Sequence, residues 1–395
     1  MNRKERVHQL ARQYFEDIVA IRRDIHMHPE IGFEVERTAG IAAREMEKLG
    51  LEVRTGVGKT GVVADLNIPG ATRRIALRAD MDALPMQELG NPPYKSRIDG
   101  KAHMCGNDAH TAMLIGAARI LTTLREELSA GVRFIFQPNE ENIPGGAPAM
   151  IADGCLEGVD EIFGLHVWPL HPTGTISICN GPALGQPDVF EIEIKGIGGH
   201  AAVPHKTVDP IVIGAQFVSN LQSIVSRNVD PLESAVVSVT QFHAGSTHNV
   251  IPENARIVGT VRTFDKSIQR EIRHRLKSLL AALTAAHGAE YAFNYEEGYP
   301  VCYNHEESVH KALEASREIV GEDKVIFPGT PVLGGEDFAY YTEKIPGCFI
   351  FLGIRNEQKG TVYMCHDPRF DVDEEAMIYG MALHATLALQ YGREN

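Results

Sequence analysis

Tryptophan, closely spaced cysteines and long apolar runs are scarce in this sequence. Its 395 residues hold one tryptophan and six cysteines, and the cysteines lie far apart, without a CxxC pair. That spacing fits a reducing cytoplasm better than an oxidising compartment. No apolar run approaches the roughly 18 residues of a membrane span, and residues 1–30 lack the apolar core of a signal peptide. We therefore expect a cytoplasmic protein with no membrane partner.

Basic residues are also in deficit. Lysine and arginine number 38 against 52 aspartates and glutamates, a formal net charge of −14. Binding to nucleic acid needs clustered cations, so this balance argues against a nucleic-acid partner and favours a small substrate. The length exceeds one ordinary core, which predicts two domains with room for a cleft, as in many enzymes.

The order of apolar patterns predicts an α/β fold. Residues 8–28 have the spacing of an amphipathic helix, and a second helix is expected from near Thr111. Strands are expected in GVVADLNI, RRIALRADMDAL, GVRFIFQPNEEN and EIFGLHVWPL. Strands that alternate with helices form sheets whose ligands collect at the strand ends.

The pattern changes in the middle of the chain. Residues 187–299 read as β-α-β-β-α-β, the order of a ferredoxin-like unit. Residues 300–395 then return to helix, turn and strand. We therefore predict a discontinuous first domain, 1–186 and 300–395, with 187–299 inserted into it.

The stretch HMCGNDAH, residues 103–110, has the composition of a metal site. Cys105 can bind a metal as a thiolate, and Gly106 allows a tight turn around an ion. His103, Asp108 and His110 are candidate ligands or partners of ligands. The same residues would also suit a polar loop that caps a helix at Thr111, and this stretch alone leaves both readings open.

Three further motifs follow apolar strands or lie near the C-terminus. QPNEEN carries Glu140 and Glu141, GLHVWP carries His166, and YMCHDPRFD carries His366. Adjacent carboxylates at a strand end point in different directions, so one can bind a metal while the other acts as general base. Each motif has an ordinary alternative: a solvated acidic pair, a core histidine and a turn. Four motifs at corresponding ends of one sheet favour a metal site.

These motifs together resemble a known family. HMCGNDAHTAML is similar to the signature of the N-acyl-amino-acid amidohydrolases, which include hippurate hydrolases, bacterial aminoacylases and auxin-conjugate hydrolases. RRDIHMHPEIGFEV, LRADMDALPMQE, GGHAAVPH, HNVIPENARIVGTVRTFD and GGEDFAYY extend the resemblance over nearly the whole chain. It implies a mixed-sheet α/β metallopeptidase-like catalytic domain with an inserted ferredoxin-like lid or dimerisation domain.

The resemblance also implies a site that holds two divalent ions, of Mn, Zn, Co or Ni. The positions that match the family's ligands are Cys105, Asn107, Glu141, His166 and His366. Glu140 matches the general base, which would take a proton from water and return it to the leaving amine.

Three residues of the inserted domain match other functional positions. His200 in GGHAAVPH would stabilise the oxyanion, across a dimer in related enzymes, although the stretch also suits a plain strand-to-helix loop. Asn249 and Arg262 match substrate-binding positions, and a guanidinium suits the carboxylate of an N-acyl amino acid. A homodimer or homotetramer is expected by the same resemblance.

Asn107 departs from the family, which has histidine there. A neutral amide oxygen suits Ca²⁺ better than the metals that thiolate and imidazole prefer, so one site should be weakened. An engineered substitution, a natural variant that uses one metal or a swung-in His103 or His110, and a catalytically dead relative that only binds acyl-amino acids all remain open. A dipeptidase or carboxypeptidase activity is the alternative within the wider superfamily.

Other residues near these motifs are expected to support the site. Asp80 or Asp82, with Asp82 preferred, should orient a ligand, unless it only pairs with Arg78 or Arg74. Glu336 and Asp337 of GGEDFAYY are expected in a similar supporting role, toward ligands or substrate. Cys365 is expected to be buried and not a ligand.

Overall fold

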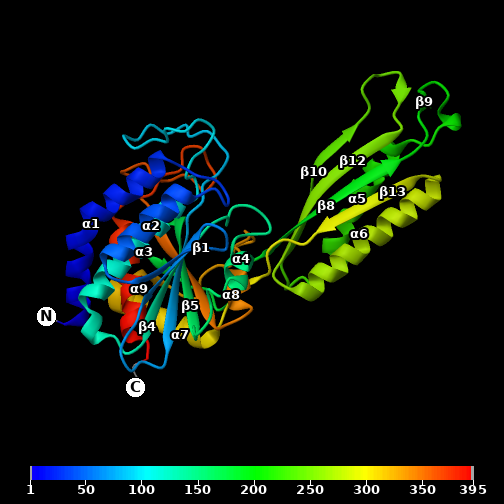
Figure 1. The fold of residues 1–395 in the computed structure, drawn as a ribbon. Coiled ribbons are helices and arrows are strands. Elements are labelled where there is room, and N and C mark those ends of the chain that lie inside the picture. The colour runs from blue at the N-terminus through cyan, green and yellow to red at the C-terminus, as the bar shows by residue number, and fades with distance from the viewer. Residues whose placement is uncertain (1, 393–395) are drawn as a thin grey trace. The chain divides into compact units, whose positions relative to one another are not determined.

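Two sheets carry the two units of the chain in this computed structural model, which describes residues 2–392 (Figure 1). One unit takes in the chain up to Ala183, residues Cys302–Pro331 and the chain from Asp337 onward. The other comprises Leu184–Val301 and Val332–Glu336. The expected insertion, 187–299, falls inside the second unit, and Val332–Glu336 groups with it although it lies far along the chain.

The first unit contains seven α-helices and most of the strands among the described residues. The helices are α1 (Arg3–Met27), α2 (Glu36–Lys48), α3 (Asn107–Thr123), α4 (Ala147–Ala152), α7 (Glu306–Val320), α8 (Ala339–Thr342) and α9 (Ala376–Gln390). The strands are β1 (Glu52–Val57), β2 (Gly61–Leu66), β3 (Arg74–Asp80), β4 (Gly131–Gln137), β5 (Glu161–Pro172), β6 (Ile176–Ser177), β14 (Cys302–Asn304), β15 (Val325–Ile326) and β16 (Gly347–Arg355), with β7 (Gly181–Leu184) leading toward the second unit. Short 3-10 turns occur at Arg125–Glu127 and Glu322–Lys324 in this unit, and at Pro204–Lys206 in the second.

A mixed eight-stranded sheet forms the centre of this unit, in the order β1-β2-β4-β3-β5-β16-β6-β15. Four adjacent strands of this sheet, β4, β3, β5 and β16, run parallel to one another. These strands are apolar along most of their length, as strands covered on both faces must be. Because they run the same way, their carboxyl ends meet at one edge, and the motifs after β3 and β4 emerge there.

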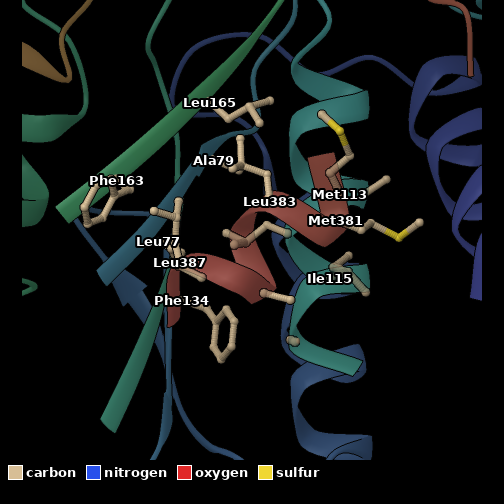
Figure 2. Packing of buried hydrophobic residues seen from close by; sticks show 14 of the residues in the cluster. Leu77, Ala79, Met113, Ile115, Phe134, Phe163, Leu165, Met381, Leu383 and Leu387 are labelled. Atoms are coloured by element: carbon tan, nitrogen blue, oxygen red, sulfur yellow. The ribbon is translucent and has the colours of Figure 1, made fainter. Parts of the chain in front are cut away.

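Helices α3 and α9 pack together against the sheet. Figure 2 shows their side chains meeting those of the central strands; the labelled residues are Leu77, Ala79, Met113, Ile115, Phe134, Phe163, Leu165, Met381, Leu383 and Leu387. A Cβ added at Gly116 of α3 would lie 2.1 Å from the sulfur of Met381, and one at Gly380 of α9 would lie 2.1 Å from that of Met113. The two helices therefore approach closely, each glycine receiving the other helix's methionine.

The second unit has the ferredoxin-like order that the sequence predicts. Its elements are β8 (Gln186–Lys195), β9 (Gly199–His200), α5 (Pro210–Asn228), β10 (Ala235–Ala244), β11 (Val250–Ile251), β12 (Asn254–Thr263), α6 (Lys266–His287) and β13 (Glu290–Glu296). The sheet runs β10-β12-β8-β13 with antiparallel neighbours. A core of its own, centred on Phe190, Phe217 and Leu276, lies between this sheet and the two helices. The mixed α/β class is confirmed.

Both predicted helix starts in the first unit were placed too late. α1 begins at Arg3, not near residue 8, because Asn2 and Glu5 form a capping box. α3 begins at Asn107, not near Thr111, because Gly106 already turns the chain into the helix. Asn107, Asp108 and His110 therefore lie in the first turn of a helix. No helix among residues 2–392 is long and apolar enough to cross a membrane.

Candidate metal centre

Gly106 positions the thiol of Cys105 at the amino end of α3. Its φ is +104°, a conformation that L side chains rarely adopt, and a Cβ there would lie 2.3 Å from Cγ2 of Val167 in β5. The chain can therefore enter α3 close against β5 only with glycine at this position. The tight turn that the sequence predicts around Cys105 is present.

Cys105, Glu141 and His366 come together from three distant segments. One ligand atom from each lies within 4.8 Å of the other two, which is close enough to hold one metal ion. Nε2 of His366 is 3.4 Å from Oε2 of Glu141, whose side chain is 4% exposed. The pKa of His366 is raised, first by this hydrogen bond to Glu141.

His166 lies beside the same thiol. Its Nε2 is 3.4 Å from Sγ of Cys105, and its Nδ1 donates to the carbonyl oxygen of Val167 over 2.6 Å. The carbonyl can only accept, so the proton lies on Nδ1 and the Nε2 lone pair faces the thiol. Burial is the main cause that lowers the pKa of His166, to about 3. The ring is neutral, as a metal-binding imidazole must be.

Asn107 is held by its amide nitrogen. Nδ2 donates to the main-chain oxygen of Asp82 over 2.8 Å and to Oε1 of Glu141 over 3.3 Å. A flipped amide would set two oxygens against each other at Asp82, so the assigned orientation is the favourable one. Oδ1 is buried without a hydrogen-bond partner among the described residues. A buried orphan oxygen costs free energy unless something such as a cation satisfies it.

Asp82 organises the acidic loop through its backbone. Its carboxylate accepts from the main-chain nitrogen of Glu140 over 2.8 Å and from that of Glu141 over 3.2 Å. Burial, then the charge of Glu141, raises the pKa of Asp82 well above its usual range. The hydrogen-bond contact with the thiol of Cys365, then burial, raises that of Cys105. Both raised pKa values show that negative charge is costly at these groups, and a divalent cation would relieve that cost. The donor set therefore fits a metal.

His110 is fully used by neighbours other than a metal. Its Nδ1 donates to Oδ1 of Asp80 over 2.7 Å, and its Nε2 accepts from the main-chain nitrogen of Val167 over 2.9 Å. The predicted pair between Asp80 and Arg78 is present as well, at 2.9 Å. Asp80 therefore orients His110, and this imidazole cannot replace Asn107 without breaking both bonds.

Arg78 extends this network to the loop that follows Glu141. It donates to Asp337 over 2.9 Å, and Asp337 accepts from the main-chain nitrogens of Gly146 and Ala147. Asp337 thus has a supporting position, as expected of GGEDFAYY. His103 is 1% exposed, and neither ring nitrogen has a partner among the described residues. Burial lowers its pKa to about 4, so it is neutral.

Two residues near the site, Arg22 and His26, are not predicted by the sequence motifs. Nε of Arg22 lies 2.7 Å from Oδ2 of Asp108, and Nδ1 of His26 lies 2.8 Å from the same oxygen, all three side chains being buried. Burial alone would raise the pKa of Asp108, but Arg22 and His26 outweigh it and hold that pKa well below its usual range. A signal existed: both residues lie on the buried face of α1, four apart.

His200 and Asn249 are neighbours in the second unit. His200 pairs with Val250 between β9 and β11, and the main-chain nitrogen of Ala201 donates to the oxygen of Asn249 over 3.0 Å. Nδ1 of His200 accepts from the nitrogen of Ala202 over 3.0 Å. The ring proton of the neutral form is therefore on Nε2, which is left as a hydrogen-bond donor.

Arg262 of β12 is half-buried without an acidic partner. Its Nε donates to Thr260 over 3.2 Å and its Nη1 to the oxygen of Leu333 over 3.3 Å. No carboxylate within the described part of the chain pairs with it. Burial lowers its pKa, against the charge of Asp188. A partly desolvated guanidinium in this state suits a small anion.

Known proteins are similar to this chain in sequence and structure. A model of peptidase family M20/M25/M40 matches residues 76–390. The chain is 45% identical to an N-acyl-L-amino acid amidohydrolase of Geobacillus stearothermophilus over 77% of this chain and 82% of that protein. It is 38% identical to thermostable carboxypeptidase 2 of Saccharolobus solfataricus, over 95% and 96%. The crystal structure of the Bacillus subtilis YXEP protein, described as a dinuclear metal binding peptidase from M20 family, matches with TM-score 0.83 and 37% identity over 96% of this chain and 98% of that one.

Proposed function

The chain belongs to peptidase family M20/M25/M40, as its motifs predict, and from this premise we propose that it hydrolyses the amide bond of N-acyl amino acids. It is a metal-dependent amidohydrolase of that family; the substrate and the roles of individual residues are the proposal. The observation that carries it is the convergence of Cys105, Glu141 and His366 beside the orphan oxygen of Asn107.

Two divalent ions of Mn, Zn, Co or Ni are proposed to be held by Cys105, Asn107, Glu141, His166 and His366. When bound, such ions polarise the scissile carbonyl and make water more acidic. Thiolate, imidazole and carboxylate suit these metals. Asn107 weakens one of the two positions, because its Nδ2 donates to Glu141 and so occupies an oxygen that a metal would otherwise share.

Glu140 is proposed as the general base. Asp82 holds its main-chain nitrogen at the end of β4, next to Glu141. The carboxylate would take a proton from the attacking water and later protonate the leaving amine. His200 would donate from Nε2 to the oxyanion of the tetrahedral intermediate, since its Nδ1 already accepts from Ala202.

Arg262 is proposed to bind the free carboxylate of the amino-acid half, with Asn249 as a second contact to substrate. The absence of an acidic partner around this half-buried guanidinium, among residues 2–392, supports the assignment. Carboxylate recognition by a guanidinium contributes two parallel charge-assisted hydrogen bonds. A substrate without that charge should therefore bind poorly.

The test compares hippurate and N-acetyl amino acids with their carboxamides, in the presence of Mn²⁺, Zn²⁺ or Co²⁺. Arg262→Met should raise KM for the acids at least tenfold and leave the carboxamides nearly unchanged. Arg256→Met is the matched control, because Arg256 lies on the same strand but pairs with Glu191 at the surface. Equal cleavage of acids and carboxamides overturns the carboxylate assignment. Faster cleavage of unblocked dipeptides indicates a carboxypeptidase or dipeptidase.

We also propose a homodimer or homotetramer in the cytoplasm. By the family resemblance, His200 matches a histidine that related enzymes contribute across a dimer. The widely spaced cysteines suit a reducing compartment. Light scattering at assay concentration tests the first point. A monomer with full activity contradicts it.

A further inference from the structure

Two cysteines lie on neighbouring loops at the metal centre. The main-chain nitrogen of His366 donates to the oxygen of Met104 over 2.7 Å, which joins the loop before α3 to the loop that carries Cys365. Sγ of Cys365 lies 3.9 Å from the carbonyl oxygen of Cys105. Cys105 thus lies next to Cys365, and the two thiols are in hydrogen-bond contact.

These two thiols differ from the other four in access. Cys365 is partly exposed, and Cys105 is 7% exposed. Cys155, Cys179, Cys302 and Cys348 are each at most 1% exposed. An oxidant from solution therefore meets Cys365 before any other thiol, with Cys105 next to it as the resolving partner.

We propose that Cys105 and Cys365 form a reversible disulfide when the metal is absent and a peroxide is present, so that this pair is a redox modification site. The loop contact described above brings them together. With Cys105 bound to a metal, its sulfur lone pairs are engaged, so it cannot resolve an oxidised Cys365 and the link does not form. The inference depends on the proposed function only for that protection.

The reaction needs one equivalent of peroxide. The sulfur of Cys365 attacks the peroxide, the O–O bond breaks, and a sulfenic acid and one water form. The sulfur of Cys105 then attacks the sulfenic sulfur, the S–O bond breaks, and the S–S bond forms with loss of a second water. Two thiols have lost two electrons and two protons, and the peroxide has become two waters.

The disulfide would prevent the empty, oxidised site from binding metal. A disulfide removes the thiolate that Cys105 would offer beside Glu141 and His166. Metal affinity depends on deprotonated ligands, so losing the only sulfur ligand should lower it strongly. A thiol reductant would restore the site.

The experiment treats chelator-stripped and Mn²⁺-loaded full-length protein with hydrogen peroxide, then alkylates under denaturing conditions and measures mass. Stripped protein should lose two of its six thiols and 2 Da, with the peptides of Cys105 and Cys365 linked, and dithiothreitol should reverse this. Mn²⁺-loaded protein should form no link between Cys105 and Cys365. Mn²⁺ uptake by the oxidised protein should weaken at least tenfold.

Two variants complete the test. Cys365→Ser should abolish the link in stripped protein, whereas Cys155→Ala should lose one unrelated thiol and keep the link. A stripped native chain that retains both thiols, or that gains 32 Da at Cys365 without a link, overturns the proposal. Equal linking in Mn²⁺-loaded protein overturns the protective role of the metal. Mass and thiol counts do not depend on hydrolysis, so a wrong substrate assignment leaves the result readable.

Discussion

Nδ2 of Asn107 donates to the main-chain oxygen of Asp82 over 2.8 Å. The same Asp82 holds the main-chain nitrogens of Glu140 and Glu141. Asp82 therefore fixes both the start of α3 and the acidic loop. The Asn107 amide is oriented by this contact, with its oxygen left unpaired.

Histidine at position 107 should allow a second ion to bind. Asn107→His is expected to raise the rate of N-acyl amino acid hydrolysis at least about 100-fold, because both ions then share carbonyl polarisation and water activation. Metal content by native mass spectrometry should rise from one ion to two. Asn142→His, an exposed position in the same acidic loop, is the control and should change neither. An unchanged rate in Asn107→His would mean that asparagine belongs to a working site.

The two adjacent glutamates should separate in function. Glu140→Gln is expected to lower kcat by about 10² to 10⁴, the usual contribution of a general base, with metal content unchanged. Glu141→Gln should lose metal, since Glu141 is the member that lies with Cys105 and His366. Rates and metal content measured on both variants decide this. The assignment is reversed if Glu140→Gln loses the ion and Glu141→Gln keeps it.

Gly106 should tolerate no side chain. Gly106→Ala is expected to lower the free energy of unfolding by about 2–4 kcal/mol, because it combines a positive φ with a Cβ 2.3 Å from Val167. Gly100→Ala is the matched control, with φ +71° and nothing within 4 Å, and should cost about 1 kcal/mol. Urea unfolding measures both. Similar losses in the two variants would show that the close contact with β5 does not matter.

Acid should destabilise the protein partly through His384. Burial, then the neighbouring His110, lowers the pKa of His384 to about 3, against about 6.5 in the unfolded chain. The folded state favours the neutral ring, so this stability is complete above pH 6.5 and declines as pH falls toward 3. At pH 4.5 the loss should be about 2–3 kcal/mol.

His384→Gln removes the titrating imidazole and tests whether its protonation lowers the stability in acid. The variant should lose less stability than the native chain between pH 7 and pH 4.5, measured by urea unfolding at both values. His287→Gln is the control, because His287 is exposed at the end of α6, and it should follow the native chain. Parallel pH profiles for native protein and His384→Gln would contradict the burial argument.

Much of the architecture followed from the sequence because it depends on local periodicity. Short stretches of sequence predict the apolar strands β3, β4 and β5, the ferredoxin-like order of the second unit and the tight turn at Gly106. The ligand and catalytic assignments rest on the resemblance to the amidohydrolase family and stay predictions.

Tertiary structure decided which polar neighbours each residue of HMCGNDAH received. His110 is bonded to Asp80 and Val167, Asp108 to Arg22, and Asn107 to Asp82. These partners come from other segments of the chain. A buried polar group needs a hydrogen-bond partner, and the fold decides which residue supplies it. The sequence does not reveal that partner, because it can lie far away along the chain. The sequence therefore determined which side chains could bind a metal, whereas packing determined which of them remain available to do so.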